Sequence, residues 1–169
     1  MTYVAKRTKG TAGAPLFLTF HGTGGSEDQF HGFAEQLVPG AHVTSPRGDV
    51  SEGGALRYFR RAAEGVYDMD DLAKRTSAMA DFIAAEQGNV TPAQTIALGY
   101  SNGANILASV ALKRPYLVHD LIHRVLHLRI NVRRCERCVA PRLGIERRNT
   151  HQPVDSVFRS EIAVGIGSL

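Results

Sequence analysis

The stretch Gly99-Tyr100-Ser101-Asn102-Gly103 lies between two apolar segments and decides the fold. Before it, the short apolar run at residues 95–98 follows Pro92 and is typical of a buried strand. After it, residues 103–112 are mostly apolar and end before Pro115, which favours a helix. A serine with a glycine two residues away on each side, between a strand and a helix, has the pattern of a nucleophile elbow.

Such a turn would serve a reactive serine in two ways. It leaves the Ser101 hydroxyl exposed, and it places the backbone N–H of Asn102 at the start of a helix, where it can stabilise an oxyanion. A second glycine loop, His21-Gly22-Thr23-Gly24-Gly25, follows the apolar run at residues 16–20. Because glycines let a backbone approach a substrate closely, we expect the Thr23 N–H to be the second oxyanion donor. We interpret His21 as a structural residue beside this loop.

The remaining segments predict an α/β fold. Ser26 and Gln29 have the spacing of a capping box, and apolar residues follow at helical spacing as far as Pro39. Residues 41–45 predict a second strand, and an amphipathic helix is expected from Asp68 to about Gly88. This order of strands and helices implies crossover units, and hence a mainly parallel sheet with helices on both faces. The turn-rich residues between the second strand and the second helix predict a functional loop.

Four stretches resemble the phospholipase/carboxylesterase group of the α/β-hydrolase superfamily, particularly its bacterial members linked to hydroquinone and catechol resistance. They are LFLTFHGTGGSEDQF, SPRGDVSEGG, RYFRRAAEGVYDMDDLAKRT and TIALGYSNGANILASVALKRP. The resemblance covers roughly residues 1–121 and implies an incomplete α/β-hydrolase fold. It also implies a serine esterase, thioesterase or phospholipase that acts on small carboxylic esters without a metal or a cofactor.

The same resemblance implies roles for single residues. Ser101 would attack the acyl carbon and form an acyl-enzyme, while Thr23 and Asn102 would hold the oxyanion. Three neighbouring residues would lie near the pocket for the acyl or leaving group: Arg57, Tyr58 and Phe59. For these three, a role in surface or core packing is an equal alternative.

The segment after the resemblance differs from the family pattern. Residues 117–169 carry nine arginines, no lysine and five acidic residues, which accounts for the whole net charge of +4. The strand that ends in the triad aspartate and the glycine-flanked histidine of the family are not recognisable there. We therefore predict the front part of a hydrolase domain at residues 1–121 and an atypical tail at residues 122–169, produced by a truncated gene or a shifted reading frame.

Substitutes for the missing triad partners exist in the sequence. Asp120 and His151 follow Ser101 in the chain order that such a triad requires. His119, His123 and His127 are further candidates for the base. The alternative is a catalytically inactive hydrolase remnant that lacks the triad Asp and His.

Two other functions fit the sequence less well. A dinucleotide site would need a glycine three residues after Gly22-x-Gly24, where Glu27 stands, and no P-loop sequence occurs. The arginines of the tail could attract nucleic acid, but they are scattered among Pro, Gly and acidic residues rather than gathered on one helix face. We expect a small-molecule ester as the partner, no nucleic acid, and leave a homodimer open.

Composition and cysteine content add three expectations. No apolar run approaches the ~20 residues that span a bilayer, and the N-terminus has basic residues without an apolar signal segment. We therefore expect a cytoplasmic protein without a membrane partner. Cys135 and Cys138 form a single CxxC, which is a weak metal signal without further ligands, so we expect no bound metal.

Overall fold

The computed structural model describes residues 3–63 and 66–124, which contain a five-stranded sheet in the order β1-β3-β2-β8-β9. Its strands are β1 (Ala5–Thr8), β2 (Leu16–Phe20), β3 (His42–Pro46), β8 (Thr95–Tyr100) and β9 (Asp120–Arg124). Strand β1 runs antiparallel to β3. The other three pairings, β3 with β2, β2 with β8 and β8 with β9, are parallel. The predicted mainly parallel sheet is therefore confirmed.

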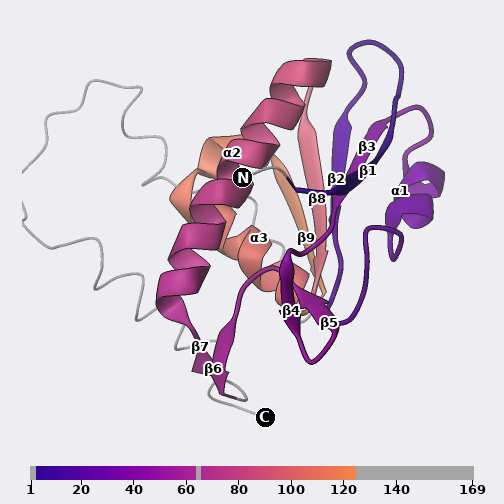
Figure 1. Ribbon diagram of the computed structural model, residues 1–169. Coiled ribbons are helices and arrows are strands. Elements are labelled where there is room, and N and C mark those ends of the chain that lie inside the picture. Colours follow the sequence, from indigo (N-terminus) through magenta and orange to yellow (C-terminus); the bar gives the residue numbers. More distant parts are fainter. Residues whose placement is uncertain (1–2, 64–65, 125–169) are drawn as a thin grey trace, which may run out of the picture. The chain divides into compact units, whose positions relative to one another are not determined.

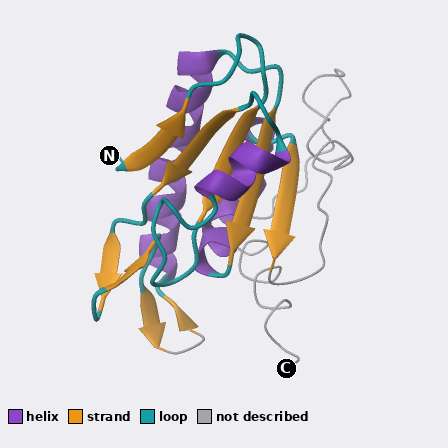
Figure 2. Cartoon of the chain, turned by 90° about the vertical axis from the view of Figure 1, so that its right-hand side faces the viewer, coloured by secondary structure: helices purple, strands orange, loops and turns teal. Residues whose placement is uncertain are grey.

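Helices cover both faces of this sheet, as the sequence predicts. Helix α1 (His31–Leu37) lies on one face, and α2 (Met69–Val90) and α3 (Asn102–Lys113) lie on the other (Figure 1). In the turned view, α1 crosses in front of the strands and the longer helices lie behind them (Figure 2). A short 3-10 helix, η1 (Pro115–Leu117), leads from α3 to β9.

Two small hairpins fill the connection from β3 to α2, where the sequence predicts a functional loop. Strands β4 (Val50–Glu52) and β5 (Ala55–Arg57) are antiparallel, and Gly53 and Gly54 form the turn between them with φ of 58° and 86°. A residue with a side chain rarely adopts such angles, so the glycines permit the tight turn. Strands β6 (Arg61–Ala63) and β7 (Val66–Tyr67) form the second hairpin.

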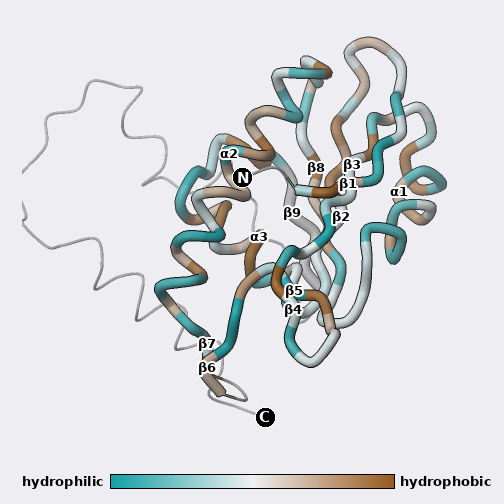
Figure 3. The backbone as a smooth tube through the Cα atoms, viewed as in Figure 1, coloured by the Kyte–Doolittle hydropathy of each residue, from teal (hydrophilic) through white to brown (hydrophobic). Residues whose placement is uncertain are grey.

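The core has two parts that the sheet separates. All five residues of β2 are buried, and this strand lies in the middle of the sheet. Leu18 and Phe20 belong to the larger cluster, which includes apolar residues of α2 and α3. Phe17 belongs to the smaller cluster, which includes Ala34 of α1. Figure 3 shows α2 with hydrophobic and hydrophilic stretches in turn, as an amphipathic helix covering a sheet requires.

The capping-box prediction for the first helix is wrong. Helix α1 begins at His31 rather than after Ser26, and its N-cap, Phe30, makes no side-chain hydrogen bond. The side chain of Gln29 instead reaches the glycine loop, where its Oε1 accepts a hydrogen bond of 2.9 Å from the N–H of Gly22. The Gln29 side chain thus makes a tertiary hydrogen bond with Gly22 instead of capping the helix, as the local pattern had predicted.

The other predicted elements agree with the structure to within a few residues. Helix α2 has Asp68 as its N-cap, and the Asp68 side chain accepts a hydrogen bond from the N–H of Asp71. The C-cap of this helix is Thr91, which has the left-handed φ of 46°. No helix in residues 3–63 and 66–124 is long and apolar enough to cross a membrane. The tail predicted at residues 122–169 lies outside the described residues beyond Arg124.

Candidate active site

Ser101 occupies the turn between β8 and α3 with a backbone conformation that is unusual for a residue with a side chain. Its φ is 51° and its ψ is −119°, and it is one of two non-glycine residues with positive φ in the described part of the chain. Such angles cost free energy and tend to occur at functional sites. The residue is partly exposed, whereas Asn102 and Gly103 after it are buried.

The glycines on both sides of Ser101 are required by close contacts. A Cβ on Gly99 would lie 2.7 Å from the Cα of Ala104, within the following helix. A Cβ on Gly103 would lie 2.4 Å from the carbonyl oxygen of His21 and 2.6 Å from that of Phe20, both next to the end of β2. Helix α3 therefore approaches β8 and β2 more closely than any side chain at these two positions would allow.

The glycine loop after β2 lies beside Ser101. A Cβ on Gly22 would be 3.6 Å from the Cβ of Ser101 and 2.7 Å from the ring of Tyr100. Gly24 has a φ of 79°. Thr23 between them is exposed, and its N–H donates no hydrogen bond within the part of the chain that the structure describes. The structure thus places Gly22, the residue before Thr23, beside Ser101, and the N–H of Thr23 is a free backbone donor in the described residues.

His21 has a structural place below this loop. Its Nδ1 lies 2.7 Å from the carbonyl oxygen of Gly22, and its Nε2 lies 2.9 Å from the N–H of Gly48. Since a backbone N–H donates, Nε2 accepts, and the ring is neutral with its proton on Nδ1. Burial lowers the pKa of His21, which keeps this neutral form. With both ring nitrogens engaged, His21 is not available as a base for Ser101.

Asn102 contributes a backbone donor and a buried side chain. It is the first residue of α3, so its N–H has no acceptor one turn earlier in the helix. Its side chain is only 3% exposed, and its Oδ1 accepts a hydrogen bond of 2.7 Å from the N–H of Tyr58. The amide side chain therefore ties the start of α3 to the segment after β5.

The three residues expected near a substrate pocket are buried. Tyr58 and Phe59 have no exposed surface, and Arg57 is 5% exposed. Phe59 contacts Tyr67 edge to face, with ring centroids 5.1 Å apart, and Arg57 lies 3.5 Å from the carboxylate of Glu52. In the described residues the three form core packing, which is the alternative that the sequence left open. Tyr58 and Phe59 belong to the larger core cluster, and a place for the three residues beside a substrate stays a prediction.

Two of the candidate triad partners, His119 and Asp120, lie at the end of β8 away from Ser101. In the parallel pairing of β8 with β9, Asp120 lies opposite Ile96, and at ~3.3 Å per residue its backbone is about 16 Å from the level of Ser101. His119 is at the same end of the sheet, where its Nδ1 accepts from the N–H of Thr95. The backbone of His123 lies opposite Gly99. His151, like His127, lies outside the described residues.

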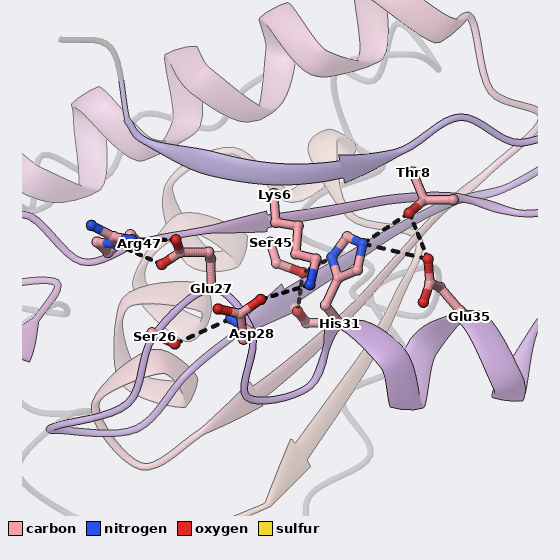
Figure 4. A network of polar contacts seen from close by, with 10 residues as sticks. Lys6, Thr8, Ser26, Glu27, Asp28, His31, Glu35, Ser45 and Arg47 are labelled. Atoms are coloured by element: carbon pink, nitrogen blue, oxygen red, sulfur yellow. Dashed lines mark hydrogen bonds and ion pairs between the residues drawn. The ribbon is translucent and has the colours of Figure 1, made fainter.

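A second group of serine, histidine and carboxylate occurs elsewhere, on α1 and the edge of the sheet (Figure 4). His31 Nδ1 lies 2.8 Å from Ser45 Oγ, and His31 Nε2 lies 3.0 Å from Thr8 Oγ1 and 3.6 Å from Glu35 Oε1. However, Ser45 and His31 are each 1% exposed. No ester could reach this serine, so the group fastens α1 to β1 and β3 and serves no chemistry.

The described residues also bear on metal binding. Among residues 3–63 and 66–124 there is no group of three or more His, Cys, Asp or Glu side chains that could hold a metal ion. Cys135 and Cys138 lie outside this part of the chain.

Sequence reasoning missed the roles that two residues, Gln29 and Tyr58, have in building the site. Gln29 holds the N–H of Gly22, and Tyr58 holds the N–H of His21 with a hydrogen bond of 3.1 Å to its hydroxyl oxygen. Neither role has a local sequence signal. Gln29 bonds to the loop before its own helix, and Tyr58 bonds to a residue that is distant in the sequence. The spacing of Gln29 after Ser26 was a signal, but for a different partner.

Comparisons with known proteins find this fold similar to that of several hydrolases. The chain is 43% identical over 122 residues to MhqD of Bacillus subtilis (strain 168), which is named as a hydrolase. Among solved structures it resembles the protein Atu2452 of unknown function from Agrobacterium tumefaciens str. C58, with 53% identity and a TM-score of 0.68. It also resembles the Bacillus cereus carboxylesterase, with 35% identity and a TM-score of 0.67. No family model matches the chain.

These matches are partial in both directions. They cover 68% of this chain for MhqD, 70% for Atu2452 and 72% for the carboxylesterase. In turn, the chain spans 60% of MhqD and 58% of each of the two solved structures. The predicted incomplete α/β-hydrolase fold is thus confirmed.

Proposed function

Because the described residues form the front part of an α/β hydrolase related to the carboxylesterases, we propose that this chain is a serine hydrolase of small carboxylic esters and that Ser101 is its nucleophile. Thioesters and phospholipid esters present the same acyl carbon, so they belong to the proposed substrate class. The small-molecule ester is the proposed partner, and nucleic acid is not part of the proposal.

The conformation of Ser101 carries this proposal. A serine with φ of 51° persists only where the surrounding structure offsets the free-energy cost of that angle. Here the turn is possible because Gly99 and Gly103 have no side chains that would collide with the neighbouring backbone. A structural turn would have no need of a serine at this point, since glycine adopts the same angles freely. A partly exposed hydroxyl at a strained turn, with free N–H groups beside it, is the arrangement that acyl transfer uses.

The proposed reaction has two steps. Ser101 Oγ attacks the acyl carbon, a base takes the hydroxyl proton, and the alcohol leaves with a proton, so that an acyl-enzyme remains. Water then attacks the same carbon, and the acid and free Ser101 are released. In both steps the negative charge on the carbonyl oxygen would be held by the backbone N–H groups of Thr23 and Asn102, which need no rearrangement to receive it.

The base is not assigned among the side chains that the structure describes, and His123, whose backbone lies opposite Gly99, stays a candidate. His21 has both ring nitrogens engaged, and His119 and Asp120 lie at the other end of β8. We retain His151 as the candidate base of the sequence. Asp120 is not retained as the acid, because the register of β9 places its backbone opposite Ile96, far from Ser101. The competing proposal is an inactive hydrolase remnant, in which Ser101 keeps its conformation but no base activates it.

Labelling with a fluorophosphonate probe separates these two proposals. The purified full chain would be incubated with the probe beside Ser101→Ala, and the modified residue would be located by peptide mass spectrometry. Labelling of the parent at Ser101, absent from the variant, supports the hydrolase. A folded parent that takes up no probe supports the inactive remnant and contradicts the hydrolase.

A second comparison tests the base. If the parent is labelled, His151→Ala should lower the labelling rate by at least about a hundredfold, because triad residues act as a unit. His127→Ala is measured beside it as a rival candidate for the base, since it removes another histidine of the same segment. An unchanged rate in His151→Ala would exclude His151 as the base.

A further inference from the structure

Tyr58, which lies just after β5, is bonded to both sides of the candidate oxyanion site. On the side of Thr23, the N–H of His21 donates to the Tyr58 hydroxyl oxygen at 3.1 Å. On the same side, the N–H of Gly24 donates to the carbonyl oxygen of Leu56 at 2.9 Å. Residues before and after Thr23 are therefore both held by one short segment, while the N–H of Thr23 stays free.

The same segment also holds the start of α3. The N–H of Tyr58 donates to Asn102 Oδ1 at 2.7 Å, and the Asn102 side chain is buried. The side chain of asparagine is short, with only Cβ between the amide group and Cα. A fixed Oδ1 therefore limits how far the backbone of Asn102 can shift. The backbone N–H of Tyr58 and its hydroxyl thus reach the two donors from one residue.

Tyr58 itself has little freedom to move. Its side chain has no exposed surface. The centroid of its ring lies 4.7 Å from the ring centroid of His21 and 5.5 Å from that of Phe20. Its hydroxyl donates to the carbonyl oxygen of Pro46 at 2.8 Å, at the end of β3. Burial raises the pKa of Tyr58 well above its ordinary value, so the hydroxyl keeps the proton that this bond needs.

We propose that Tyr58 is a positioning residue that sets the separation of the two oxyanion donors, Thr23 N–H and Asn102 N–H, through its hydroxyl on the His21 side and its N–H on the Asn102 side. The inference rests on the proposed function for the meaning of the two donors. An oxyanion site stabilises charge only if its donors are fixed before the reaction, and a shift of ~1 Å can cost a large part of the rate.

The test is residue-resolved amide exchange by NMR on the full chain, comparing Tyr58→Phe with Tyr67→Phe. Both changes remove one hydroxyl and keep the ring. Tyr67 loses only its hydrogen bond of 2.7 Å from Asn105 Nδ2, on a different hairpin. In Tyr58→Phe we expect the hydrogen-bonded amides of residues 21, 22, 24 and 25 to exchange about tenfold faster, which is the loss of one hydrogen bond, with no change in β8 or the centre of α3. Tyr67→Phe should leave residues 21–25 unchanged.

Reactivity supplies a readout that a purely structural role would not alter. If Ser101 takes up the fluorophosphonate, its labelling rate should fall about tenfold to a hundredfold in Tyr58→Phe and stay at the parent's value in Tyr67→Phe. A chain that takes up no probe contradicts the proposed function. The amide exchange rates alone then test the positioning role of Tyr58. Failure of the proposed function and failure of the positioning role can therefore be told apart.

Two exchange results would overturn the inference. One is unchanged exchange at residues 21–25 in a folded Tyr58→Phe variant, and the other is a uniform increase over the whole sheet, which reports general destabilisation. Should Tyr58→Phe not fold, Asn102→Ala and Asn102→Asp replace it, because aspartate keeps the acceptor for Tyr58 N–H. Faster exchange of the Tyr58 amide in Asn102→Ala that Asn102→Asp reverses supports the positioning role, and equal exchange in both variants contradicts it.

Discussion

At the scale of single residues, the turn around Ser101 combines strain with close contact. Its positive φ costs about 1–3 kcal/mol, and the packing of α3 against the ends of β8 and β2 must offset that cost. The sequence could predict this site because the requirement is local. A serine with glycines at two fixed positions, between an apolar strand and an apolar helix, has few other structural explanations.

Gly103→Ala should be strongly destabilising. The added methyl would lie 2.4 Å from the carbonyl oxygen of His21, which is backbone and has little room to move. We expect the free energy of unfolding to fall by about 1–3 kcal/mol, as for other overpacked positions, and the midpoint of urea unfolding to fall with it.

Gly88→Ala is the matched control for that change. Gly88 lies inside α2, and a Cβ there meets no atom within 4 Å. Alanine is the better helix former, so this variant should gain about 0.5–1 kcal/mol. Equal destabilisation of both variants would contradict the contact that the structure places at Gly103.

Stability should fall as the solution becomes mildly acidic, because two histidines are buried in their neutral form. Burial lowers the pKa of both His21 and His31 below the ordinary value of 6.5. Protonation is then easier in the unfolded chain, so the stabilisation is complete above about pH 6.5 and is lost as the pH falls toward the lower folded pKa. Urea unfolding at about pH 7.5 and 5.5 should show the decrease.

The variant His31→Gln tests the contribution of one of these rings. Three charged groups act on His31: Glu35 and Asp28, which raise its pKa, and Lys6, which lowers it. Removing the ring should make the loss of stability between the two pH values smaller than in the parent, whatever the variant's stability at neutral pH. An unchanged or larger loss would contradict a lowered pKa of His31 in the folded chain.

At the scale of elements, prediction succeeded where the hydrophobic pattern is strong and failed where a distant contact decides. The apolar run of β2 and the helix α3 were predicted from their own residues. The start of α1 was not, because Gln29 bonds to Gly22 instead of capping the helix. Strand β1 was not predicted either, since its sequence AKRT is polar and it pairs along only one described edge, with β3.

The C-terminal end of α2 offers a stabilising change. Thr91 is exposed and has a φ of 46°, where a β-branched residue is strained and glycine is not. Thr91→Gly should raise the free energy of unfolding by about 0.5–1 kcal/mol, which thermal unfolding would report as a higher Tm. Thr91→Ala keeps a side chain in the left-handed region and should gain less. A Thr91→Gly variant less stable than the parent would contradict the assigned cap.

At the scale of the whole molecule, the catalytic partners could not be predicted because they have no local pattern. An elbow is recognisable from five consecutive residues, whereas a triad acid and base are defined by where the fold brings them. Asp120 fits the required chain order, yet the register of β9 puts its backbone beside Ile96, far from Ser101. Order along the chain is thus a necessary condition for a triad and a weak predictor of it.

The apolar side of α1 should promote self-association. Phe33 is 52% exposed and Leu37 is 50% exposed, and the two lie one turn apart on the helix. Phe30 at its start contacts Tyr100, which is 45% exposed. Sedimentation analysis should show concentration-dependent association that Phe33→Gln with Leu37→Gln weakens. Leu112→Gln, which replaces an equally exposed leucine of α3, is the control and should have a smaller effect.

The strand order has a consequence for how the chain folds during synthesis. Strand β2 is paired with β3 on one side and with β8 on the other, so its second neighbour is made only after the whole of α2. Until residues 95–100 leave the ribosome, this fully buried strand has an open edge. Closing that edge joins parts of the chain far apart in sequence, which makes it a slow, late step. Ser101, which follows β8 directly, is therefore among the last places to acquire its native conformation.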